Sequence, residues 1–221
     1  DSEAAARYLG AAIARTIDGN DRYVFTQLRS KMFITLGRFA EARGDALLLV
    51  AMSPGERHGW DLLQETEYTV GNWEASLTYY EMARSRRVRP STMDRPVERE
   101  AHSRVYAAGA CAALGRYEEA VRYAREAVAA APQDALARDA LRRAEGVWER
   151  LFLLNRSLEL AAAHLRSQDV PRALAALEAA PPDCRDDPRV VGLRALADGW
   201  APPSEGDLVP LPTFDPPSPW A

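Results

Sequence analysis

The strongest hydrophobic pattern lies between residues 101 and 134, where two stretches of helical periodicity flank Gly115. After this glycine, apolar and small residues recur at steps of three and four, and therefore share one helix face: Tyr117, Ala120, Val121, Ala124, Ala127 and Val128. Gly115 can adopt the left-handed conformation that ends a helix. Pro132 ends the second helix, because it has no amide hydrogen to donate. The segment therefore predicts two helices joined by a tight turn.

The same turn pattern occurs twice more toward the N-terminus. Each copy has a glycine, an aromatic residue two positions later and a small residue three positions after that: Gly37, Phe39 and Ala42 in one copy, Gly71, Trp73 and Ser76 in the other. These two turns lie 34 residues apart, and the third follows after an insertion at residues 91–100. A recurring period of this length is typical of a repeat protein.

These residues resemble the tetratricopeptide-repeat (TPR) family, in which a glycine, an aromatic residue, two small residues and a proline occupy the places of Gly115, Tyr117, Ala120, Ala127 and Pro132. The resemblance implies an all-α fold without β-strands, a right-handed superhelical solenoid of helix-turn-helix repeats. Gln168 replaces the turn glycine in a fourth, weaker unit. We expect a solenoid over residues 1–199, with repeats at about 23–56, 57–90, 101–134 and 154–187, and flanking helices at 2–17 and 188–199.

Two segments allow more than one interpretation. Residues 135–168 can form one helix of about 30 residues, roughly 45 Å long at 1.5 Å per residue, or two helices with a break near Leu153. Residues 200–221 contain seven prolines and several apolar residues, a composition that favours an extended chain. This stretch is a linker to another domain, a partner-binding tail, or a strap over the solenoid.

Composition narrows the classes of protein further. A net charge of -4 and a pI near 5.5 do not fit a general nucleic-acid binder, which is normally basic. The arginines at 84, 86, 87, 89 and 95 could form an anion-binding patch, but we favour ordinary cations near a helix C-terminus. No apolar run approaches the ~20 residues that cross a bilayer. Abundant alanine and arginine, with Lys31 as the single lysine, suggest a bacterial and cytoplasmic protein.

Chemistry-bearing motifs are absent from the sequence. Cys111 and Cys184 form no CxxC pair, and the three histidines, His58, His102 and His164, lack ligand-like spacing. No phosphate-binding glycine loop, zinc-protease motif or nucleophile elbow is present. We therefore expect no catalytic residues, no metal and no cofactor, and we interpret the chain as a protein other than an enzyme.

The TPR resemblance also implies where a partner binds, because the first helix of each repeat lines the concave side of such a solenoid. Transferred position by position, the expected partner-binding groove consists of Leu28, Lys31, Ile34, His58, Asp61, Leu62, Glu65, Tyr68, His102, Val105 and Tyr106. The family's clamp for a terminal carboxylate needs several cations, whereas Asp61 and Glu65 would repel one. We expect a protein or peptide partner with apolar anchors, and this chain's own C-terminal tail is one candidate. The alternative is a non-catalytic TPR domain of a larger enzyme, such as a bacterial transferase.

Overall fold

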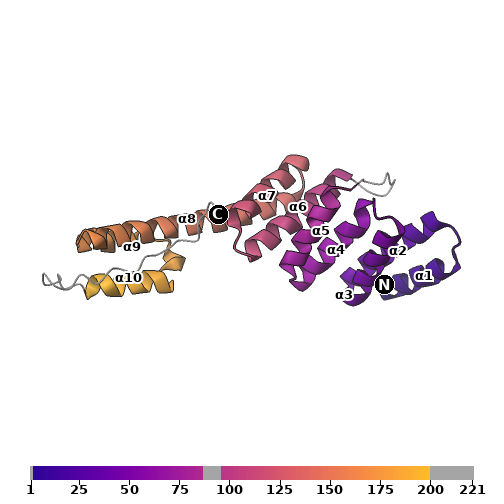
Figure 1. The fold of residues 1–221 in the computed structure, drawn as a ribbon, viewed down its shortest axis with the longest axis horizontal. Helices are drawn as coiled ribbons and strands as arrows, with labels where there is room; N and C mark the ends of the chain where they lie inside the picture. The colour runs from indigo at the N-terminus through magenta and orange to yellow at the C-terminus, as the bar shows by residue number, and fades with distance from the viewer. Residues whose placement is uncertain (1, 87–95, 200–221) are drawn as a thin grey trace. The chain divides into compact units, whose positions relative to one another are not determined.

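The computed structural model describes residues 2–86 and 96–199, and within these ranges it contains helices and no β-strand. The all-α class predicted from the sequence is therefore confirmed for this part of the chain. Figure 1 shows the helices in chain order. They are α1 (Ser2–Arg15), α2 (Gly19–Thr35), α3 (Phe39–Met52), α4 (Arg57–Val70), α5 (Trp73–Arg84), α6 (Pro96–Ala113), α7 (Tyr117–Ala130), α8 (Ala135–Arg166), α9 (Val170–Glu178), the short 3-10 helix η1 (Pro182–Cys184) and α10 (Pro188–Asp198).

The turns after α2, α4, α6 and α8 share one backbone geometry. Gly37, Gly71 and Gly115 have φ values of 72°, 86° and 76°, and Gln168 adopts the same left-handed conformation with φ 60°. In each turn this residue's amide donates to the carbonyl three positions back, and the next amide donates to the carbonyl five positions back. These two bonds satisfy carbonyls at the helix C-terminus. The fourth turn therefore repeats the other three although glutamine replaces glycine.

Small residues allow the paired helices to approach closely. Ala42, Ser76, Ala120 and Ala173 hold the equivalent position in the second helix of each pair, and all are fully buried. At Ser76 the hydroxyl donates to the carbonyl of Gln64 at 3.1 Å, so its burial leaves no unsatisfied hydroxyl. This is the packing that the repeat pattern predicts, because a larger side chain here would force the helices apart.

Several helix ends differ from the expected boundaries. Helix α2 begins at Gly19, because the carboxylate of Asp18 accepts hydrogen bonds from the amides of Asn20 and Asp21 at 2.6 and 3.1 Å. Helix α6 begins at Pro96, inside the stretch expected to be an insertion. A proline suits the first turn of a helix, because the amides there have no hydrogen-bond acceptor within the helix.

The chain divides into two compact units, residues 1–144 and 145–221, which we describe separately. In the first unit, α1 to α7 pack consecutively as antiparallel neighbours (Figure 1), and Leu141 and Ala144 of α8 join the core cluster of α6 and α7. Its core contains alanines and large side chains in contact, among them Tyr80, Tyr123, Leu49 and Leu63.

The second unit consists of the remainder of α8 together with α9, η1 and α10. Its core is formed by Leu154 and Leu165 from α8, Leu177 from α9, and Val190 and Leu193 from α10. A salt bridge of 2.5 Å between Arg150 and Asp183 adds a polar contact. Of the two paths considered for residues 135–168, the structure has one continuous helix to Arg166.

Parts of two predictions concern residues outside the described ranges. The tail at residues 200–221 lies outside the described residues, as do three of the five clustered arginines, at positions 87, 89 and 95. The superhelical handedness remains a prediction. Of the two arginines described, Arg84 pairs with Glu81 at 3.4 Å, and the Arg86 guanidinium lies 5.6 Å from the Trp60 ring centre. Both contacts fit ordinary surface cations.

Candidate binding groove

Helices α2, α4 and α6, the first helices of three successive pairs, together line one groove of about 590 Å³. The volume falls within the range of roughly 300–1,000 Å³ typical of ligand sites. Eight of the eleven residues predicted for the groove contribute to its lining: Lys31, Ile34, His58, Asp61, Leu62, Glu65, His102 and Tyr106. The helix-turn-helix repeat explains the convergence, since it brings each first helix back beside the previous one.

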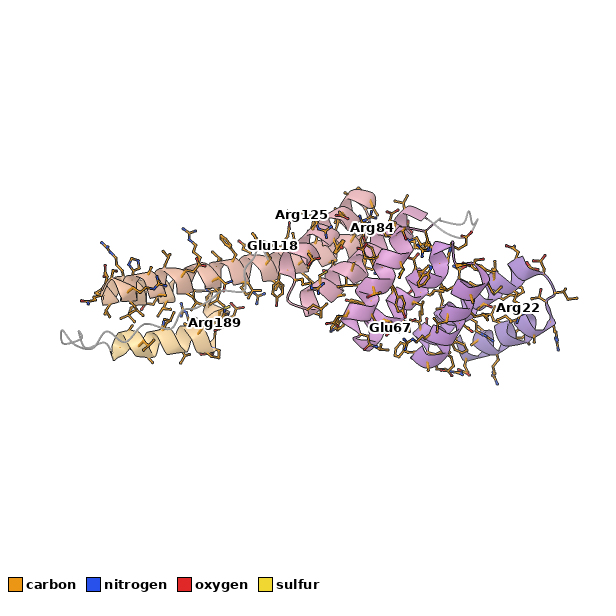
Figure 2. The ribbon with its side chains drawn as sticks, in the orientation of Figure 1. Arg22, Glu67, Arg84, Glu118, Arg125 and Arg189 are labelled. Carbon is orange, nitrogen blue, oxygen red and sulfur yellow. The ribbon has the colours of Figure 1, made fainter. Side chains whose placement is uncertain are left out.

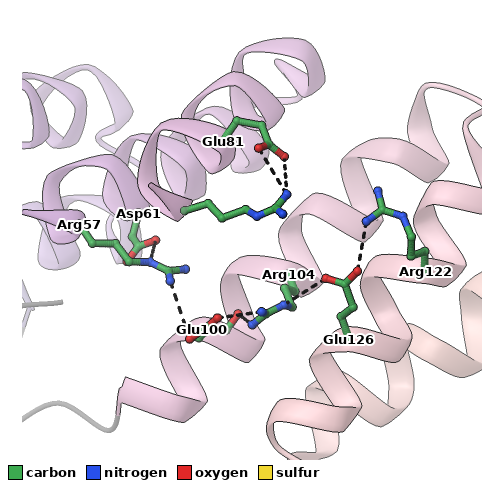
Figure 3. Close-up of polar contacts among 8 residues, drawn as sticks. Arg57, Asp61, Glu81, Glu100, Arg104, Arg122 and Glu126 are labelled. Atoms are coloured by element: carbon green, nitrogen blue, oxygen red, sulfur yellow. Dashed lines mark hydrogen bonds and ion pairs between the residues drawn. The ribbon is translucent and has the colours of Figure 1, made fainter. Parts of the chain in front are cut away.

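Ion pairs connect the helices at one end of the groove. The Nε atom of Arg57 donates to both oxygens of Asp61 at 3.0 and 3.2 Å, and both side chains are nearly buried. Figure 3 shows the series continuing through Glu100 and Arg104 of α6 to Glu126 of α7. Burial raises the pKa of the Asp61 carboxyl, although the Arg57 guanidinium opposes this. Asp61 is therefore already paired within the chain, and does not present a bare negative charge to a partner.

A buried amide–hydroxyl pair joins α4 to α6 at the groove wall. The Gln64 amide donates to the carbonyl of Ser103 at 2.7 Å, and the Ser103 hydroxyl donates to Oε1 of Gln64 at 2.5 Å. Both side chains are almost completely buried. Because each polar group has a partner, this contact fixes the register of the two helices without an unsatisfied atom.

Glu65 of α4 and Lys31 of α2 both line the groove. Burial raises the pKa of the Glu65 carboxyl, and the hydroxyl of Tyr106 donates to its Oε1 at 3.2 Å. Burial also lowers the pKa of the Lys31 ammonium, with a further contribution from Arg99. Lys31 makes no side-chain hydrogen bond or ion pair with any other described residue. Its ammonium therefore keeps its donors available inside the groove.

The two groove histidines have different surroundings. His58 is 2% exposed and packs edge-on against the Tyr23 ring, with ring centres 6.4 Å apart. His102 is partly exposed, and its Nε2 lies 2.9 Å from Oδ2 of Asp134. Asp134 also accepts from the amide of Ala137 at 2.8 Å, and these two contacts lower the pKa of its carboxyl. His102 thus connects the groove to the start of α8.

Three predicted groove residues do not line it. Val105 is buried against Ala101, Ala127 and other residues of the core. Tyr68 packs between the Trp73 and Tyr106 rings, with ring centres 5.3 and 5.0 Å away. Leu28 is half-buried outside the lining. Successive residues of a helix point about 100° apart, so Tyr106 reaches the groove whereas its neighbour Val105 enters the core.

Several residues line the groove that the sequence did not predict there. Arg99 and Glu98 fall within the stretch expected to be an insertion, whereas they belong to the first turns of α6 and line the groove. The Pro96 that precedes them is a helix-start signal that could have identified this turn. Ser103 and Gln64 also line it, but only the tertiary register of α4 and α6 reveals their pairing.

Among residues 2–86 and 96–199, no group of three or more histidine, cysteine or acidic side chains could hold a metal ion. No helix in these ranges is both long and apolar enough to cross a membrane. Cys111 is fully buried, and burial raises the pKa of its thiol to about 11, which disfavours the reactive thiolate.

Comparisons with known proteins add little to this geometry. No family model and no curated protein matches the sequence. Among solved structures, the chain is similar to one in the crystal structure of the APC/C hetero-tetramer Cut9-Hcn1, at 11% identity and a TM-score of 0.46. The match covers 79% of this chain but only 30% of the other chain.

Proposed function

We propose that the chain is a non-catalytic protein-interaction scaffold that binds a segment of a protein partner in the groove between α2, α4 and α6. The observation that carries this proposal is the joint lining of one groove by three helices that lie far apart in sequence. Extended concave surfaces of this kind are what stacked helical repeats use for binding. The groove mixes apolar side chains with polar groups able to set a register.

The lining chemistry suits a peptide with apolar anchors. Met32 and Ile34 offer apolar contact, while Lys31 and His102 offer polar contact. Asp61 and Glu65 already interact with Arg57 and Tyr106, respectively. Their carboxyl groups therefore need no new partner when a peptide binds. An amphipathic helix or a proline-rich segment would place apolar side chains against this surface and leave its polar side exposed.

A displayed library of random peptides provides the test. We expect selection on the purified chain to enrich peptides with spaced apolar residues. Their binding should weaken by roughly tenfold or more, about 1.4 kcal/mol, when Ile34→Asp or Lys31→Glu alters the groove. The matched control is Arg125→Glu on the exposed face of α7, which should leave binding unchanged. Binders that are insensitive to both groove variants would contradict the proposal.

The same assay tests whether this chain's own tail occupies the groove. A synthetic peptide of residues 201–221 should compete with the selected peptides if the tail binds the groove. If it does not compete while the selected peptides respond to Ile34→Asp, the tail is excluded and the groove remains a site for another protein. If no peptide is enriched, the groove assignment itself fails.

A further inference from the structure

The outward side of α3 carries an apolar stripe along the length of the helix, with the exposed side chains of Glu41 and Arg43 at its two edges. Five residues at helical spacing form this stripe, and all are exposed: Ala40, Gly44, Leu47, Leu48 and Ala51. Leu47 and Leu48 are 49% and 37% exposed. We call these five residues the α3 seam. None of them lines the groove, so the seam is a separate surface.

The repeats themselves provide an internal reference for the seam. Where α3 has Ala40, Gly44, Leu47 and Leu48, the corresponding positions of α5 hold Glu74, Thr78, Glu81 and Met82, and those of α7 hold Glu118, Arg122, Arg125 and Glu126. Figure 2 labels Glu118 and Arg125, which extend from α7. At these four positions the side chains are thus charged in α7, mixed in α5 and apolar in α3. The apolar character is therefore particular to α3, since the fold itself accepts charged side chains at these positions.

Gly44 provides a second observation. It lies inside a helix, where glycine is unfavourable, and a Cβ at this position would meet no atom within 4 Å. Nothing within the described part of the first unit therefore requires a glycine here. A glycine on an exposed helix face does allow another backbone to approach closely.

The charges beside the seam are already paired. Arg38 forms salt bridges with Glu3 at 3.0 Å and Glu41 at 2.7 Å. Arg43 pairs with Glu67, which is labelled in Figure 2, at 3.1 Å. A partner with an uncharged apolar surface would therefore meet no unpaired charge from these side chains, and a second α3 seam is such a surface.

We propose that the α3 seam is a self-association surface, and that it binds the α3 seam of a second copy of this chain in antiparallel orientation. The residues are small toward the N-terminal end of the seam and large near its centre. Antiparallel pairing places Leu47 of one copy against Gly44 of the other, and Ala40 against Ala51. Such a contact is isologous, because a two-fold axis exchanges the two seams.

The length of α3 limits the expected affinity of the proposed dimer. Its 14 residues extend about 21 Å, so the seam alone is smaller than the roughly 800 Å² per partner of a standard stable interface. The proposal therefore predicts a weak dimer, populated at high protein concentration and in fast exchange with the monomer.

Sedimentation velocity over a concentration series from ~1 to ~300 µM tests the association, because a weak interface requires the high end of this range. The wild-type chain should sediment increasingly as a dimer. Gly44→Arg and Leu47→Glu should remain monomeric throughout. Each introduces the residue that α7 or α5 already carries at the same position, so the fold should tolerate it. Thr78→Arg places the same charge on α5 and should still dimerise.

Cysteine cross-linking tests the orientation in a Cys184→Ser background. Leu47→Cys lies close to the proposed two-fold axis and should form a disulfide-linked dimer upon oxidation, whereas Ala40→Cys should not. Efficient cross-linking through both positions would indicate parallel helices and overturn the antiparallel arrangement. A wild-type chain that stays monomeric at every concentration, or dimers that survive both Gly44→Arg and Leu47→Glu, would overturn the proposal.

Discussion

The aromatic ring of Tyr68 occupies the space that a side chain at Gly109 would need. A Cβ at Gly109 would lie 2.8 Å from Cε2 of Tyr68, closer than real contacts allow. The Tyr68 ring also packs against the ring of Tyr106, which lies one turn before Gly109 on α6, and the ring centres are 5.0 Å apart. Helices α4 and α6 can therefore hold this spacing only because position 109 has no side chain.

Gly109→Ala should destabilise the chain by about 1–3 kcal/mol, because the added methyl overpacks the contact with Tyr68. Urea unfolding would measure the loss. Gly146→Ala is the control, because a Cβ at this position would meet no atom within 4 Å. The higher helix propensity of alanine should then increase the free energy of unfolding by about 0.5–1 kcal/mol. Equal effects of the two substitutions would show that Tyr68 does not limit the approach of α6.

Replacing Gln168 with glycine should stabilise the fourth helix pair by about 1 kcal/mol. Gln168 has φ 60°, a conformation that costs a residue with a Cβ roughly 1–2 kcal/mol. The other three turns have glycine at this position. Amide exchange along α9 would show the gain as slower opening. Ser167→Gly, one residue earlier, provides the control and should not reproduce it.

Ser103→Ala should cost about 1–3 kcal/mol, because it removes the donor to the buried Oε1 of Gln64. The double variant Gln64→Leu with Ser103→Ala removes both polar partners, and should be less destabilised than the sum of the single changes predicts. Denaturant unfolding of the full double-mutant cycle measures this coupling. Additive effects would mean that the two residues act independently.

The stability of the chain should depend on pH through Glu65. Burial raises the pKa of its carboxyl above the ordinary 4.5, so the folded state binds this proton more tightly than the unfolded state does. Ionisation of Glu65 therefore destabilises the fold as pH rises through the folded pKa. Glu65→Gln can still accept from Tyr106, and should raise the melting temperature at pH 7. This gain should vanish below the ordinary pKa, where both states carry the proton.

Thermal melts at pH 7 and near pH 4 would measure this difference between the wild type and Glu65→Gln. Glu118→Gln makes the same chemical change on an exposed face of α7, and therefore controls for the loss of one charge. A melting temperature at pH 7 that is unchanged or lowered by Glu65→Gln would contradict the interpretation.

The turns of this fold could be predicted from sequence because their chemistry is local. A glycine followed by an aromatic residue two positions later identifies the turns at Gly37, Gly71 and Gly115, and the backbone there has the expected positive φ. Gln168 shows the limit of this signal. Its turn forms with the same hydrogen bonds, since the packing of Leu165 and Leu177 in the core outweighs the local cost.

The groove could be predicted only in part, because tertiary register decides which side chains reach it. Helix identity was enough to place Lys31, His58 and Tyr106, which do line the groove. It was not enough to exclude Val105, which lies in the core, or to anticipate that Arg57 would pair with Asp61. An error of one residue in register rotates the expected direction of a helical side chain by about 100°. A side chain expected in the groove can then lie in the core.

Lys31 is the only lysine of this chain, and its position in the groove makes the site chemically addressable. Acylating reagents attack the neutral amine, which the lowered pKa makes more abundant at neutral pH. Aside from the chain's terminal amine, a limiting dose would therefore deposit its label inside the groove. Peptide mapping of that label would report occupancy in the unaltered protein, since a bound segment would shield the amine.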